Sequence, residues 1–197
     1  PLTDQEVRNS LLVALNPDLY KWMRTLASNP NFQETIAITP RSSLEQYDME
    51  LLLRFIVFRN LPENELRTTI IGDLSEFLTD RMLKMANDQN FDIDEEERAF
   101  NHTFNLIASS VGEDAFRRYD HNKHRFAGAF LVTPFEVVAL GLGFNYKKWD
   151  ENDFSLIEKI IKDIWKNQRI LNNSGSGTRA NSRIPHVVDE GRSLFKK

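Results

Sequence analysis

The sequence predicts an all-α protein, an irregular multi-helix bundle with an extended C-terminal tail. Two observations carry this prediction. Apolar residues recur at spacings of three and four in successive segments that follow helix start signals, and no strand alternation of useful length occurs before residue 170. With 197 residues, of which 41% are hydrophobic, the chain is long enough to bury a core of its own. We divide it into a helical body, residues 1–172, and a tail, residues 173–197.

The first two helices are predicted from a start signal and from prolines. Thr3 followed by Glu6 forms a capping box, which predicts a helix from Asp4 to Leu15 that stops before Pro17. Apolar residues at helical spacing then predict a second short helix ending near Pro30; they are Leu19, Trp22, Met23 and Leu26. The segment from Asn31 to Arg41 has a weak pattern that Pro40 interrupts.

A wide apolar stripe marks the next helix, from Ser43 to about Phe58, and its width predicts burial on most sides. Glu50 and Arg54 are four residues apart, so they are expected to form an ion pair that orients this buried helix. Two more helices are predicted from carboxylate start signals, Asp73 with Glu76 and Asp94 with Glu97, the second ending at Gly112.

The C-terminal third begins with the most complete start signal, Thr133-Pro134-Phe135-Glu136. The nearly apolar helix from Phe135 to Leu142 is expected in the middle of the bundle, and a last long helix from Asn152 to Gln168. Residues 172–177 read as a flexible connector and 178–195 as an extended tail, anchored only by Ile184-Pro185 and Val187-Val188.

Composition excludes several classes of protein. The chain has no cysteine, which removes disulfides, thiol nucleophiles and cysteine-based zinc sites, and it has no apolar run of about 18 residues or signal peptide. A cytoplasmic protein with no membrane partner is therefore expected. No catalytic residue, no metal site and no cofactor is assigned to this chain, because His121 and His124 lack a third ligand and no Ser/His/Asp arrangement is defensible.

Charge is distributed unevenly. Up to Phe116 the chain carries 10 basic and 20 acidic residues, and from Arg117 onward 15 basic and 9 acidic ones. A basic segment in a predicted loop could contact phosphates while Tyr119 or Phe126 stacks on a base. The alternative is an ordinary solvated surface. The candidate DNA-binding residues are Arg117, Arg118, Lys123, His124 and Arg125 in this segment, with Arg179 and Arg183 in the tail.

Four blocks of sequence, in order, resemble one known family. They are residues 1–9 (PLTDQEVRN), Arg41 with residues 48–55 (DMELLLRF), residues 115–118 with 126–130 (AFRR and FAGAF), and residues 177–185 with 191–195. They resemble the C-terminal helical half of the ParB/sulfiredoxin-like family typified by the GmrS part of GmrSD enzymes. Those are type IV restriction enzymes, which depend on DNA modification, and the resemblance covers nearly the whole chain.

The resemblance implies a role in phage defence, beside a ParB-like domain linked to nucleotide hydrolysis. Neither the Asp-Gly-Gln-Gln-Arg motif of that domain nor an HNH nuclease is present in this sequence. The sequence starts where the family's N-terminal domain ends, so we expect a fragment, or a subunit whose partner supplies the other half. A nucleotide is then expected only in the full-length protein.

Three hypotheses follow. The first is a non-catalytic helical module that supports a ParB-like domain, on the same or a separate chain, and contacts DNA. The second is a protein interaction module that docks through its basic loop and tail. The third is an enzyme whose nucleotide site Arg179 or Arg183 completes in the full-length protein.

Overall fold

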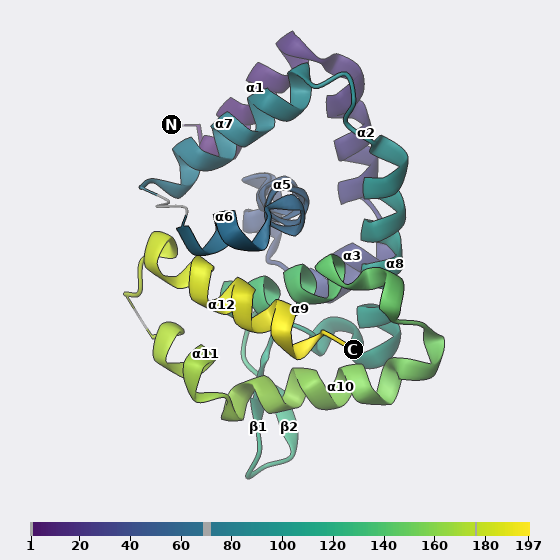
Figure 1. Ribbon diagram of the computed structural model, residues 1–197, viewed down its shortest axis with the longest axis vertical. Helices are drawn as coiled ribbons and strands as arrows, with labels where there is room; N and C mark the ends of the chain where they lie inside the picture. Colours follow the sequence, from purple (N-terminus) through teal and green to yellow (C-terminus); the bar gives the residue numbers. More distant parts are fainter. Residues whose placement is uncertain (1, 69–71, 176) are drawn as a thin grey trace.

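The computed structural model describes residues 2–68, 72–175 and 177–197, and most of these residues are helical (Figure 1). Within these residues the α-helices are α1 (Asp4–Leu15), α2 (Pro17–Ala27), α3 (Pro30–Ile36), α4 (Pro40–Leu44), α5 (Tyr47–Asn60), α6 (Glu63–Thr68), α7 (Leu74–Asn87), α8 (Ile93–Val111), α9 (Val132–Phe144), α10 (Phe154–Asp163), α11 (Gln168–Asn173) and α12 (Ala180–Leu194). Short 3-10 turns are η1 (Gly112–Asp114), η2 (Tyr146–Lys148), η3 (Glu151–Asp153) and η4 (Ile164–Lys166). The predicted all-α bundle is confirmed.

Two helices, α5 and α9, form the centre of the bundle. Every residue of α5 from Asp48 to Phe58 except Glu50 is buried, and so is every residue of α9 from Thr133 to Gly143. Phenylalanines of α3, α5 and α8 meet edge to face, with ring centroids 4.8–5.3 Å apart for Phe32 with Phe104, Phe32 with Phe100 and Phe55 with Phe100. The broad apolar stripe of α5 and the apolar sequence of α9 explain this burial, since neither helix offers a polar face to water.

Two predicted start signals are confirmed. Thr3 caps α1 through the capping box: its hydroxyl accepts from the Glu6 N–H at 3.2 Å, and the Glu6 carboxylate accepts from the Thr3 N–H at 2.7 Å. Asp73 caps α7 by accepting from the Glu76 N–H at 3.0 Å. Helix α1 has the predicted bounds, Asp4–Leu15.

Prolines begin helices that the sequence analysis did not separate. Asn29 caps α3, and Thr39 caps α4, and each is followed by proline in the first turn. The predicted helix from Ser43 is therefore wrong at its start. It is divided at Gln46, whose positive φ of 59° ends one helical segment before α5 begins.

The later helices also begin or end at other residues than predicted. Asp92, two residues earlier than expected, caps α8. Helix α9 starts at Val132 without a side-chain cap, so Thr133 lies inside its first turn. The single helix predicted over residues 152–168 is replaced by η3, α10 and η4, with α11 beginning at Gln168.

The predicted extended tail is wrong, because most of it forms α12 and belongs to the core. Ile184, Val187 and Val188 are fully buried, and Gly191 lies so close to α9 that an added Cβ would meet the Val137 carbonyl oxygen at 2.2 Å. Pro185, expected as part of an apolar anchor in an extended segment, lies in the second turn of α12, where it removes a single helical hydrogen bond. The boundary placed at residue 172 falls inside α11.

The basic segment is not an irregular loop, as predicted, but a β-hairpin. Strands β1 (Arg118–Asp120) and β2 (Arg125–Ala127) pair antiparallel, and the hairpin projects at the bottom of Figure 1, next to α10. Three-residue strands are too short to show alternation in a sequence, which is why the pattern missed them.

Candidate nucleic-acid interface

The hairpin has an inner and an outer face. Tyr119 lies opposite Phe126 in the register, and their rings meet at 4.9 Å between centroids on the inner face. Arg118 and Arg125 are exposed on the outer face, where Arg125 lies opposite Asp120. Because successive strand residues point to opposite faces, the sequence brings basic side chains together on the outer one.

Contacts with α10 and η4 hold the hairpin in place. One imidazole nitrogen of His121, Nε2, lies 2.9 Å from the Lys162 carbonyl oxygen. The Lys162 ammonium group lies 5.3 Å from the centroid of the Tyr119 ring, and Tyr119 is only 9% exposed. Tyr119 is therefore an anchor of the hairpin, and the expectation that it stacks on a base does not fit its burial.

Three basic side chains of the hairpin have no ion-pair partner among the described carboxylates: Arg118, Lys123 and Arg125. Asp120, the nearest carboxylate along the chain, accepts backbone N–H groups from Lys123 at 3.1 Å and Asn122 at 2.9 Å. These hydrogen bonds, the one from Lys123 first, hold the pKa of Asp120 below its ordinary value. Asp120 is thus committed to the turn, and the three cations face solvent.

The other candidate residues lie elsewhere or already have partners. Arg117 pairs with Asp114 at 3.1 Å and Glu113 at 3.3 Å. Arg179 is exposed at the start of α12, well away from the hairpin in Figure 1. His124 is exposed in the turn with a positive φ of 50°.

Arg183 is withdrawn from the surface by a buried carboxylate. Its Nε lies 2.7 Å from an oxygen of Glu136, whose side chain is 0% exposed. The structure therefore brings together Arg118, Lys123, His124 and Arg125. It places Arg179 and Arg183 elsewhere, and it pairs the adjacent Arg117 with carboxylates.

A hollow of about 550 Å³ lies between the hairpin and η4. It is lined by Arg118, Tyr119, Asp120, His121, Asn122, Ala127, Gly128 and Trp165. The Arg118 guanidinium carbon lies 5.9 Å from the centroid of the Trp165 ring. Trp165 lies on η4, far from the hairpin in the sequence, and no local pattern predicts that the two meet.

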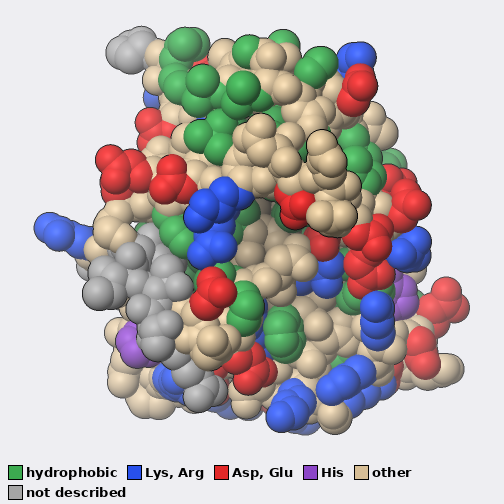
Figure 2. Space-filling view, turned by 45° about the horizontal axis from the view of Figure 1, so that its top comes forward, with side chains coloured by type: hydrophobic (Ala, Val, Ile, Leu, Met, Phe, Trp, Pro, Cys, Tyr) green, Lys and Arg blue, Asp and Glu red, His purple; other side chains and the backbone are tan. Residues whose placement is uncertain are grey.

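The neighbouring helix adds lysines that are already paired. Lys159 and Lys166 pair with Asp163, at 2.9 and 3.2 Å, and Lys162 pairs with Glu158 at 2.6 Å. Figure 2 shows Lys and Arg side chains gathered along the lower edge of the molecule, where α10 lies in Figure 1. These lysines are therefore paired with carboxylates of α10, unlike Arg118, Lys123 and Arg125.

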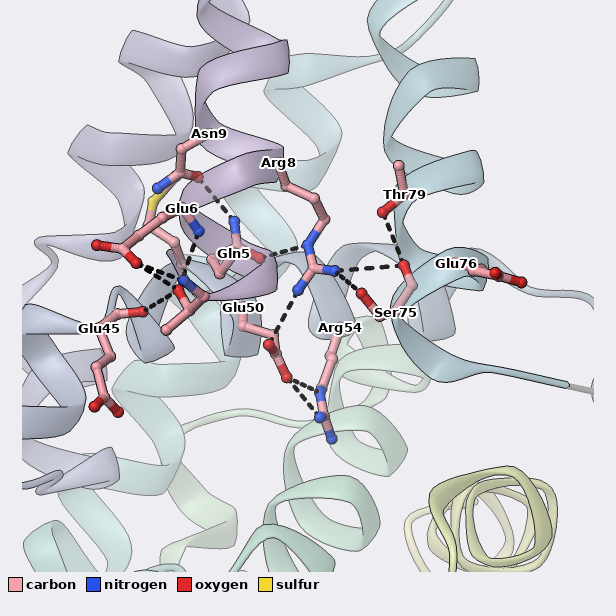
Figure 3. A network of polar contacts seen from close by, with 12 residues as sticks. Gln5, Glu6, Arg8, Asn9, Glu45, Glu50, Arg54, Ser75, Glu76 and Thr79 are labelled. Carbon is pink, nitrogen blue, oxygen red and sulfur yellow. Dashed lines mark hydrogen bonds and ion pairs between the residues drawn. The ribbon is translucent and has the colours of Figure 1, made fainter. Parts of the chain in front are cut away.

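A second polar cluster lies at the other end of the bundle (Figure 3). The Glu50 carboxylate accepts hydrogen bonds from Arg8 at 3.0 Å and from Arg54 at 2.6 Å. The predicted ion pair between Glu50 and Arg54 is therefore confirmed. Burial opposes the charge on Arg54, yet Glu50 and Glu136 outweigh it and raise its pKa. Since each of these arginines is satisfied by carboxylate, amide or hydroxyl partners, this cluster joins helices and offers no free group for chemistry.

The described part of the chain holds neither a metal-binding cluster nor a membrane-spanning helix. No three His, Asp or Glu side chains there converge to hold a metal ion. No helix among the same residues has the length and apolar character needed to cross a membrane.

Comparison with known proteins gives no relative to guide the assignment. No family model, curated protein or solved structure matches this chain.

Proposed function

We propose that this chain is a non-catalytic module that contacts DNA through the outer face of the hairpin. The observation that carries the proposal is the set of unpaired cations Arg118, Lys123 and Arg125 on one projecting element. The phosphate groups of DNA can act as the anionic partners of these side chains. Contacts between basic side chains and phosphates position a protein on DNA without reading its sequence.

The proposal extends to the context that the sequence resemblance implies. In that context the chain is the helical half of a GmrS-like phage-defence protein, and it supports a ParB-like domain that hydrolyses nucleotide. The support for this part is the order of the four resembling blocks together with an apolar face on α1. Val7, Leu11 and Leu15 follow one side of that helix and are 45%, 40% and 54% exposed.

Figure 2 shows hydrophobic side chains at the top of the molecule, where α1 and α7 lie in Figure 1. An apolar helix face of this kind is typical of a surface that another domain covers. We propose that the ParB-like domain covers this apolar face of α1. When this chain and the ParB-like domain are co-expressed, Leu11→Lys is expected to abolish their co-purification. Retained co-purification would contradict this assignment.

The alternative, docking of a protein partner through the basic loop and tail, has less support. Helix α12 is packed into the core, so the tail is not available as a free docking segment.

Charge reversal tests the DNA contact. The variant Lys123→Glu/Arg125→Glu is expected to weaken binding to a 20-base-pair duplex, and to a single strand of the same length, by more than about tenfold at 50 mM salt. Arg179→Glu is the matched control, because it changes an exposed arginine away from the hairpin and is expected to leave the affinity unchanged. Equal loss in both variants, or none in the first, would contradict the proposal.

A further inference from the structure

We propose that the hollow beside the hairpin receives an unstacked base of single-stranded nucleic acid. This inference rests on the proposed function and narrows its ligand class. It depends on the side chains that line the hollow and not only on the cations around it.

Two flat groups line the hollow. The guanidinium of Arg118 lies 5.9 Å from the ring centroid of Trp165, and Trp165 is half-buried where η4 meets the hairpin. Arginine planes and indole rings are the side chains on which exposed bases stack. The volume, about 550 Å³, lies within the usual range of small-molecule sites.

Hydrogen-bonding groups line the same hollow. Asp120 accepts the two turn N–H groups with Oδ1, which leaves its other carboxylate oxygen, Oδ2, as an acceptor for a ligand. The Asn122 side chain carries both a donor and an acceptor. Amide and carboxylate groups are those that pair with the edges of bases, so the hollow offers hydrogen-bonding partners as well as flat surfaces.

The geometry favours a single strand over a duplex. In a duplex, both faces of a base are covered by neighbours and its edge is paired, so the base cannot lie against Trp165 unless it leaves the stack. Lys123 lies in the turn that follows Asp120 and Asn122, where it can reach a phosphate flanking the inserted base. A single strand can therefore place a base in the hollow and its phosphates on the hairpin cations at the same time.

The test compares three DNA ligands of equal length: oligothymidylate, an abasic strand with the same phosphates, and a duplex. Stacking of one base on an aromatic side chain supports a preference of about tenfold for oligothymidylate over the abasic strand. We expect the variant Trp165→Leu to lose this preference and to keep the salt dependence. We expect Trp165→Phe, which retains an aromatic ring, to restore most of it.

Fluorescence gives a second readout, because oligothymidylate is expected to quench Trp165. The quenching should disappear in Trp165→Phe and persist in Trp22→Phe, the control, since Trp22 lies on α2 and bonds to Glu97. Circular dichroism confirms that each variant is folded before binding is compared.

The outcomes separate this inference from the function on which it rests. If the wild-type protein binds oligothymidylate and the abasic strand equally, or if Trp165→Leu keeps the preference, the base site is wrong while backbone contact stands. Equally tight binding of the duplex and oligothymidylate would also contradict the base site and leave the backbone contact standing. If no DNA binds in a salt-dependent way, or if an acidic polypeptide such as polyglutamate binds as tightly, the proposed function fails as well.

Discussion

Arg183 at the start of α12 donates two hydrogen bonds to Glu136 on α9, from Nε at 2.7 Å and from Nη2 at 2.9 Å. Glu136 also accepts from Nη1 of Arg54 on α5, at 3.0 Å, and its own side chain has no exposure to solvent. One buried carboxylate therefore joins three helices, including the one that the sequence analysis expected to be an extended tail.

Neutralising that carboxylate should destabilise the fold. In Glu136→Gln, half-buried Arg183 loses its carboxylate partner and buried Arg54 keeps only Glu50, so we expect the free energy of unfolding to fall by about 3 kcal/mol. Urea denaturation followed by circular dichroism measures it. The control Glu158→Gln removes an exposed partner of Lys162 and should cost less than about 1 kcal/mol. A similar loss in both variants would show that Glu136 has no special role.

Removal of residues 173–197 should prevent cooperative folding. The deletion takes away fully buried side chains, among them Ile184, Val187 and Phe195, and it uncovers α9. We expect a chain ending at Asn172 to bind a hydrophobic dye and to show no sharp thermal transition, whereas a chain ending at Phe195 stays folded. A cooperative transition in the shorter chain would support the original division into body and tail.

The contact between α9 and α12 should not tolerate a side chain at Gly191. An added Cβ would lie 2.2 Å from the Val137 carbonyl oxygen, so Gly191→Ala must push the two helices apart. We expect destabilisation of about 1–3 kcal/mol, the usual cost of overpacking a core, measured by thermal denaturation. Gly175→Ala is the control, because its Cβ would meet Thr178 at an ordinary distance of 3.5 Å. Equal stability of the two variants would contradict the close packing.

Acid should weaken the junction between α8 and η2 through Glu95. Hydrogen bonds from Lys147, then Tyr146 and Arg98, hold the pKa of the Glu95 carboxyl at about 2, against an ordinary value of 4.5. Because the folded state has the lower pKa, the stabilisation is present above pH 4.5 and is lost as the pH falls toward 2. Carbon-13 NMR titration measures this pKa, and Lys147→Ala should raise it toward 4.5. An ordinary pKa in the wild-type protein would show that the contact does not persist in solution.

Local sequence signals predicted much of the fold, because caps and apolar spacing act over a few residues. The capping box of Thr3 and Glu6 and the cap at Asp73 are examples. Two other predictions, based on proline and on a weak apolar pattern, were wrong. Pro30, expected at the end of a helix, lies in the first turn of α3. The segment expected to be an extended tail forms α12, because it packs against α9.

The candidate site was predicted less completely. The density of basic residues pointed to Arg118, Lys123 and Arg125, but composition cannot show which arginines have carboxylate partners, and Arg183 has one in Glu136. The contact of Trp165 with the hairpin joins segments distant in sequence. Tertiary packing alone creates it, so no local pattern in the sequence could have revealed it.

The salt dependence of DNA binding tests the account most directly. Affinity for a 20-base-pair duplex, measured between 50 and 200 mM salt, should fall along a line whose slope reports the phosphates contacted, at about 0.9 per contact. In the triple variant Arg118→Gln/Lys123→Gln/Arg125→Gln we expect the slope to become shallower by about 2–3. An unchanged slope and affinity in that variant would contradict the assignment of the hairpin as the DNA-contacting surface.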